Sequence, residues 1–180
     1  AVSAPSGCNS QCWNFIAIKN REIIRQIEAA VIERVEDILS KSKQDITPEY
    51  LSGKRKMVSF FSKAPVVIAV FMTDAAFYDP VFISALKDRG YNHKGIMDLF
   101  ANYDLLSVGA AIQNMLLAVH EKGYGACWMN EPAVAEGKIN EILGVSNEQR
   151  FISLVPIGVP AYMPRSKNMK TFDDVFSVIG

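Results

Sequence analysis

No segment of the sequence says more about the architecture than the run Leu105-Leu106-Ser107-Val108-Gly109-Ala110-Ala111-Ile112-Gln113-Asn114-Met115-Leu116-Leu117-Ala118-Val119. The run is apolar nearly all round, and Gly123 and Gly125 follow it, as glycine commonly does just past a helix C-terminus. A helix without a polar face must be buried on every side. We therefore expect a central helix that also meets a partner subunit, and a helix sandwiched within one chain is the alternative.

Apolar segments before and after this helix predict strands. Residues 13–18 alternate large apolar and mixed side chains, as a half-buried strand does. Residues 66–71 form a continuous β-branched run, which suits a strand that is covered on both faces. Residues 126–129 and 151–157 are further short apolar runs, and Pro156 predicts that the second of them lies at a sheet edge or carries a bulge.

Helices alternate with these strands. Asn20 is a candidate N-cap for a helix of about five turns whose apolar positions recur every three or four residues. Residues 133–143 predict a short helix that Gly144 ends, and the Lys-Arg-Lys triplet 54–56 is read as a solvated surface. Residues 74–102 predict an irregular excursion with one or two short helices, a candidate lid. Strands and helices interleave without the regular rhythm of a doubly wound protein, so the expected class is α+β.

The composition excludes several classes of protein. The chain has 180 residues, which is the size of one domain, and 49% of them are hydrophobic. Its 19 basic and 19 acidic residues cancel, so the basic bias of a nucleic-acid-binding protein is absent. The longest apolar run, residues 64–72, is far shorter than the ~20 residues of a membrane span. Three cysteines are too few for a disulfide-built domain. We expect a soluble, cytoplasmic domain that binds neither nucleic acid nor membrane.

The sequence offers little protein-only chemistry. It has no Gly-x-Ser-x-Gly elbow, no dinucleotide fingerprint and no P-loop. His93 and His120 are far apart, and Cys8, Cys12 and Cys127 do not have the spacing of a zinc site. A Cys8–Cys12 redox pair and two buried thiols remain alternatives. We expect no metal, and we expect a bound organic cofactor to carry any difficult chemistry.

Three segments have groups that could hold such a cofactor. The first is the polar loop Pro5-Ser6-Gly7-Cys8-Asn9-Ser10-Gln11, whose hydroxyl and amide groups can pair with a heterocycle edge. The second is residues 127–132, at the end of a short strand, where backbone N–H groups are available. The third is the basic tail 165–170, which can contact a phosphate. The loop and the tail each have an ordinary alternative: a turn and a solvated tail.

Four stretches together resemble the nitroreductase-like family of FMN-dependent oxidoreductases. They are residues 4–15, 109–120, 123–129 and 157–160, and their order fits that family from residue 1 to about 175. The resemblance implies one nitroreductase-like domain over residues 1–180. Its fold would be an α+β sandwich with a mostly antiparallel sheet flanked by helices.

The resemblance also implies a homodimer that binds one FMN in each of two clefts at the subunit interface. The apolar helix 105–119 would lie at that interface. An Arg-rich phosphate clamp, which the family carries before the Pro-Ser loop, would lie upstream of residue 1. Within this sequence the implied FMN-binding residues are Pro5, Ser6, Gly7, Asn9 and Gln11 from the loop, Met129, Asn130 and Glu131 beside the flavin ring, and Arg165 and Lys167 at the phosphate.

The implied activity is ping-pong transfer of two electrons. NAD(P)H would reduce the flavin and leave, and a nitroaromatic, a quinone or another flat electrophile would take its place. No side chain is expected to act as a catalytic acid or base. The alternatives are a flavin-binding module without NAD(P)H turnover, and the peptide oxidation, dehalogenation or flavin degradation that some relatives perform. Six aromatic residues could either cover the flavin or belong to the core: Phe77, Tyr78, Phe82, Tyr91, Phe100 and Tyr103.

Overall fold

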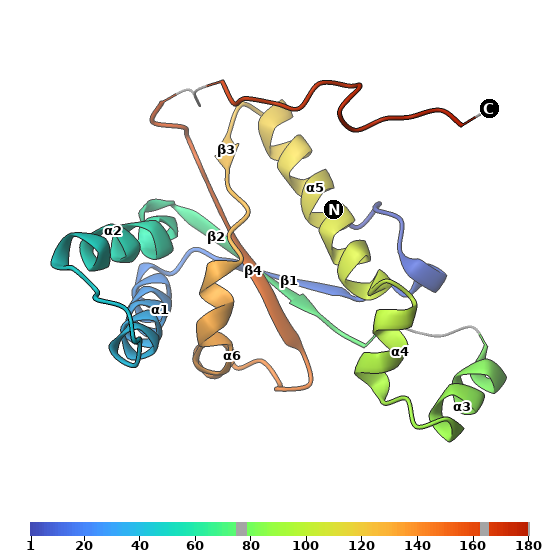
Figure 1. Cartoon of the computed structure of the whole chain (residues 1–180). Coiled ribbons are helices and arrows are strands. Elements are labelled where there is room, and N and C mark those ends of the chain that lie inside the picture. The colour runs from blue at the N-terminus through green and yellow to red at the C-terminus, as the bar shows by residue number, and fades with distance from the viewer. Residues whose placement is uncertain (75–78, 163–165, 180) are drawn as a thin grey trace.

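The fold is built on a four-stranded sheet. The computed structural model describes residues 1–74, 79–162 and 166–179. The strands β1 (Trp13–Ile18), β2 (Val66–Met72), β3 (Gly125–Ala126) and β4 (Arg150–Gly158) lie in the order β1-β2-β4-β3 (Figure 1). Every neighbouring pair is antiparallel. The predicted α+β class with an antiparallel sheet is confirmed.

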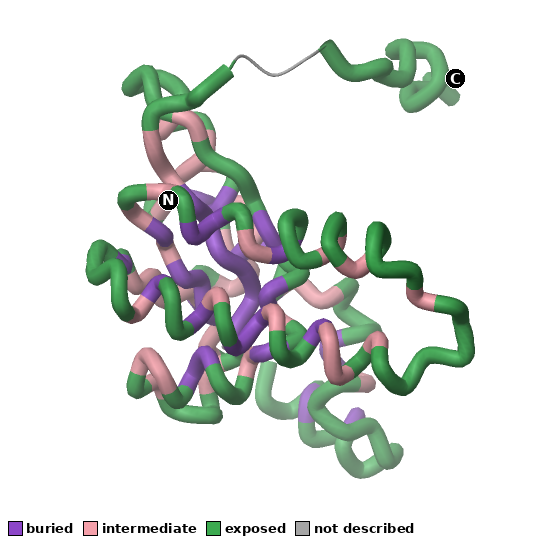
Figure 2. Tube along the Cα trace, turned by 90° about the vertical axis from the view of Figure 1, so that its left-hand side faces the viewer, coloured by how far each residue is buried: buried purple, intermediate pink, exposed green. Residues whose placement is uncertain are grey.

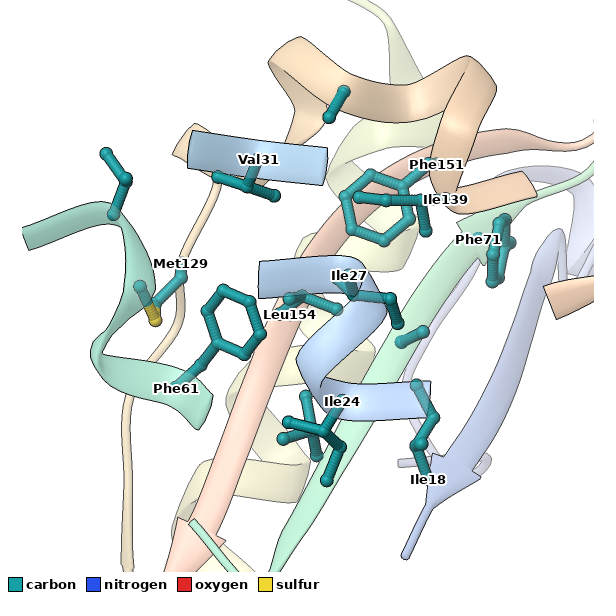
Figure 3. Packing of buried hydrophobic residues seen from close by; sticks show 14 of the residues in the cluster. Ile18, Ile24, Ile27, Val31, Phe61, Phe71, Met129, Ile139, Phe151 and Leu154 are labelled. Atoms are coloured by element: carbon teal, nitrogen blue, oxygen red, sulfur yellow. The ribbon is translucent and has the colours of Figure 1, made fainter. Parts of the chain in front are cut away.

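One face of the sheet is covered by α1 (Arg21–Ser40), α2 (Pro48–Ser59) and α6 (Glu136–Leu143) (Figure 1). Helix α1 begins where the sequence predicts, because the Asn20 side chain accepts a hydrogen bond from Glu22 N at 2.8 Å. The side chains between these helices and the sheet form a dense apolar core (Figure 3). Its fully buried members include Ile24, Ile27, Val31, Phe61, Phe71, Ile139, Phe151 and Leu154.

Helix α5 (Tyr103–Glu121) covers the opposite face of the sheet. Val108 and Ile112 are fully buried against the strands. The helix was expected to be buried on every side, and within one chain that is wrong: Leu105, Leu106 and Leu117 are 39%, 64% and 58% exposed. The sheet can cover only one side of a helix, so the outer side of α5 is left as an apolar surface.

Two short helices, α3 (Pro80–Asp88) and α4 (His93–Leu99), occupy much of the predicted excursion. Asp79 caps α3 by accepting a hydrogen bond from Phe82 N at 2.9 Å, and Asn92 caps α4 in the same way. Phe77 and Tyr78 lie outside the described residues. That these helices form a lid stays a prediction.

Pro156 predicted a sheet edge or a bulge: strand β4 is not at the edge, but it carries a bulge at Ile152. Pro156 pairs with Val67 of β2 on one side. On the other side, Leu154 directs both its N–H and its C=O to Met129, at 3.0 Å each. In an antiparallel strand, the backbone groups of residues two apart point to the same neighbouring strand. The N–H that Pro156 lacks would therefore point at residues 127–128. Pairing is interrupted at those two residues: β3 ends at residue 126 and the ladder resumes at Met129.

The C-terminal segment stands away from the body of the molecule (Figure 2). Residues 166–179 are exposed along their whole length. One turn is formed where Phe176 N donates to Phe172 O at 3.0 Å and the two rings pack 4.6 Å apart. Across the described ranges, no helix has the length and apolar content needed to cross a membrane.

Candidate functional site: two groups of residues around helix α5

The polar loop 5–11 is fastened to the N-terminal part of α5. Gly7 N donates a hydrogen bond to Ser107 Oγ at 3.0 Å. Gly7 also lies so close to the ring of Tyr103 that a Cβ atom at this position would be 2.0 Å from Cδ2 of the ring. The glycine was expected to let the backbone approach a ring, and the ring it meets inside this chain is that of Tyr103.

The loop has an unusual backbone that displays its amide side chains. Cys8, Asn9 and Gln11 have φ values of 55°, 50° and 45°, in the left-handed region that side chains other than glycine seldom adopt. Ser6 Oγ holds this conformation by accepting a hydrogen bond from Gln11 N at 3.0 Å. The Asn9 and Gln11 side chains are exposed, and Gln11 Nε2 donates to Asn9 Oδ1 at 3.4 Å. Strain of this kind is concentrated at functional sites.

The residues behind the loop keep their protons. The buried thiol of Cys12 donates to Asp104 O at 3.5 Å, and burial raises the pKa of this thiol. Burial and the neighbouring Cys8 raise the pKa of Tyr103 to about 12. The cysteines of the described chain are all free, with Cys12 buried and Cys8 half-buried. Cys12 and Tyr103 therefore lack the lowered pKa that a nucleophile or base would need.

The second group consists of residues 127–131. It is anchored to β4, on the side of that strand where β3 pairs. Met129 exchanges two backbone hydrogen bonds with Leu154, and Asn130 Nδ2 donates to Ile152 O at 3.1 Å. Ile152 is the extra residue of a bulge, because Val70 pairs with Ser153 and the next pair skips to Phe151. The Asn130 side chain therefore fixes its own backbone at the bulge.

Glu131 is held by a residue that the sequence did not single out. Its carboxylate forms an ion pair with Lys54 of α2, which was read as part of a solvated surface. The Lys54 side chain is only 21% exposed, so that interpretation is wrong for this residue. Arg55 fits the interpretation as a solvated surface better, since Arg55 pairs with Glu36 on the outside of α1. No local signal identifies Lys54, because its partner is 77 residues away.

Of the two basic residues expected at a phosphate, only Lys167 can be placed. Its ammonium is close enough to Cys127 to oppose the rise that burial causes in the pKa of that thiol. The charge of the exposed Lys167 side chain thus acts on the segment that leads to Met129. Arg165 lies outside the described residues.

The two groups lie on opposite sides of α5. The loop meets the helix at Ser107, while Trp128 of the second group meets it at Gly109, where a Cβ atom would be 3.4 Å from the indole. Residues two apart in a helix point about 200° apart. One chain therefore does not bring the predicted residues together. The loop lies on one side of α5, while the segment 129–131 follows Trp128 on the other side and continues to the sheet face that α1 and α2 cover, where Met129 joins the core and Glu131 pairs with Lys54.

The chemistry of each group suits a flavin nucleotide. Asn9 and Gln11 offer amide donors and acceptors for the edge of a heterocycle. Glu131 begins the short 3-10 helix η3 (Glu131–Ala135), and the first N–H groups of a helix lack partners inside it. Lys167 supplies a cation for a phosphate. Among the residues that the structure describes, no cluster of histidine, cysteine and carboxylate side chains could hold a metal ion.

Comparison with known proteins shows relatives that share the fold of this chain. A BluB-like flavoprotein from Clostridium difficile 630 superposes with a TM-score of 0.82 at 28% identity, over 99% of this chain and 84% of its own. An iodotyrosine deiodinase from Thermotoga neapolitana is 26% identical over 162 residues, which are 89% of this chain and 72% of that protein. A variant of the FMN- and NADPH-dependent nitroreductase NfnB from Sphigopyxis sp. strain HMH has the same fold, with a TM-score of 0.67 at 16% identity over 97% of this chain and 82% of its own. The model of the nitroreductase family matches residues 1–159, and this chain belongs to the nitroreductase family.

Proposed function

We propose that this protein is an FMN-dependent oxidoreductase that works as a homodimer. The observation that carries the proposal is the division of the candidate residues by α5, because a second copy can bring its loop 5–11 to the segment 129–131 of the first. A two-fold pair of chains creates two such sites at once. Leu105, Leu106 and Leu117 give the pair an apolar contact that one chain leaves open.

Each group of residues has a distinct task in this proposal. The amides of Asn9 and Gln11, with Pro5, Ser6 and Gly7, bind the cofactor from one subunit. The backbone of Met129, Asn130 and Glu131 lies along the reacting edge from the other, where N–H groups stabilise negative charge. Lys167 and Arg165 contact the phosphate. Bound FMN would supply the two-electron chemistry, with NAD(P)H as donor and a nitroaromatic or quinone as acceptor.

Three aromatic residues are proposed to cover the site: Phe82 of α3, Phe100 just after α4 and Tyr103 at the start of α5. The rings of Phe82 and Phe100 are 6.3 Å apart, and those of Phe100 and Tyr103 are 6.5 Å apart, both edge to face. This series of rings runs from α3 to Gly7 of the loop. It places a row of flat apolar surfaces beside the cofactor-binding loop, and such surfaces favour flat acceptors.

The proposal is tested on the purified protein. We expect a yellow protein, or a colourless one that turns yellow with added FMN, whose absorbance near 450 nm bleaches under NADPH or NADH without oxygen and returns when menadione is added. A protein that binds no FMN contradicts the proposal. FMN binding without bleaching or quinone turnover supports the flavin-binding module instead.

A second acceptor class is favoured by the deiodinase relative. Reductive dehalogenation of an iodophenol consumes two electrons and one proton and releases the arene and iodide. Dithionite-reduced protein would be mixed with 3-iodo-L-tyrosine, and iodide and tyrosine measured. Release of both in equal amounts assigns the dehalogenation to this chain. Reduced protein that menadione reoxidises but that releases no iodide assigns quinone reduction instead.

A further inference from the structure

The segment 129–131 is fixed by two contacts with β4 and by one contact with α2. The sheet holds Met129 through its backbone and Asn130 through its side chain. Neither contact restrains Glu131, which starts η3 and whose side chain is 46% exposed. Its restraint comes from the Lys54 ammonium, which reaches across from α2.

The surroundings of Lys54 make this ion pair different from a surface pair. Lys54 and Glu131 line a cavity of about 190 Å³ whose other walls are apolar. These walls are Val35, Ile38, Leu39, Val58 and Val134. The lysine stem packs along apolar side chains while its charge reaches the carboxylate. The partial burial of Lys54 strengthens the attraction relative to a fully exposed pair.

From this geometry we infer that Lys54 is a positioning residue for the flavin site, acting through Glu131. The inference rests on the proposed function. Lys54 fixes the direction of the segment beside the cofactor, and it neutralises the one carboxylate of that segment. Negative charge builds up on a flavin when it is reduced, so an uncompensated Glu131 would disfavour the reduced form. Lys54 thereby holds the reduction potential up.

Opposite changes in potential test this role. Lys54→Met leaves the carboxylate uncompensated, and we expect the ratio of the Kd of reduced FMN to that of oxidised FMN to rise about tenfold, a potential lower by about 30 mV for a two-electron couple. Glu131→Gln leaves the ammonium alone and raises the potential. The double variant lies close to the wild type. Potentials are measured by anaerobic equilibration with a reference dye.

A purely structural role would weaken FMN binding in both single variants without shifting the potential in opposite directions. Arg55→Met is the matched control, because Arg55 is on the same helix but pairs with Glu36 of α1. It should leave the FMN affinity and the potential unchanged. Lys54→Arg keeps the charge and should restore the wild-type potential.

The outcomes separate the inference from the proposed function. A wild-type protein that binds no FMN overturns the proposed function and the inference with it. A wild-type protein that binds FMN with the same potential as Lys54→Met overturns the inference alone. If Lys54→Met does not fold, as judged by circular dichroism, Glu131→Gln decides. An unchanged potential in Glu131→Gln overturns the inference, and a raised potential supports it.

Discussion

At the scale of the residue, Gly7 has the least room for a side chain among the glycines that the structure describes. A Cβ atom there would overlap the Tyr103 ring at 2.0 Å. We expect Gly7→Ala to lower the free energy of unfolding by about 1–3 kcal/mol, because the loop or the ring must shift. Urea unfolding followed by circular dichroism measures the loss. The double variant Gly7→Ala/Tyr103→Ala should lose less than the sum of the two single changes; a purely additive loss would show that the ring is not the obstacle.

Tyr103 also predicts how stability depends on pH. The folded protein holds the phenol proton more tightly than the unfolded chain, since burial raises the pKa of Tyr103 to about 12. The contribution of this group to stability is therefore complete below the ordinary pKa of ~10 and is lost as the pH rises through about 12. Urea unfolding of the wild type and of Tyr103→Phe between pH 9 and 12 should show the wild type losing stability faster. Parallel curves would refute the assignment.

At the scale of the element, α2 contains a glycine that nothing requires. Gly53 lies in the middle of the helix, and a Cβ atom there would meet no atom within 4 Å. Gly53→Ala should raise the free energy of unfolding by about 0.5–1 kcal/mol, because alanine loses less backbone freedom on folding. Gly123 has equal space but a φ of +78°, so Gly123→Ala should destabilise the protein. Thermal unfolding of both variants separates the effect of free space from the effect of backbone conformation. Stability changes of the same sign in the two variants would contradict this explanation.

At the scale of the whole molecule, the exposed side of α5 predicts the oligomer. A carboxylate at Leu106, which is 64% exposed in one chain, would be buried in the proposed dimer. We expect Leu106→Glu to shift the protein from dimer to monomer in light scattering and to weaken FMN binding at least tenfold. Val81→Glu on α3, at a position 78% exposed, is the control and should remain dimeric. A wild type that is already monomeric would contradict the shared site.

Sequence patterns predict the helices and strands, but they do not predict which residues the fold brings together. The period of α1 and the β-branched run of β2 are local, so the sequence predicts both. The pairing of Lys54 with Glu131 spans 77 residues and leaves no periodic signal. The separation of the loop from Trp128 depends on which face of α5 meets the sheet, and a helix that is apolar all round does not specify that face.

Pro156 has a consequence for motion at the site. Because no N–H is offered at that position, Cys127 and Trp128 lie outside the ladder, between two paired stretches of backbone. Amide hydrogens without ladder partners exchange with deuterium far sooner than those of Met129 and Leu154. The proline thus leaves a short stretch of backbone that we expect to move more readily than its neighbours, directly beside the residues proposed to face the cofactor.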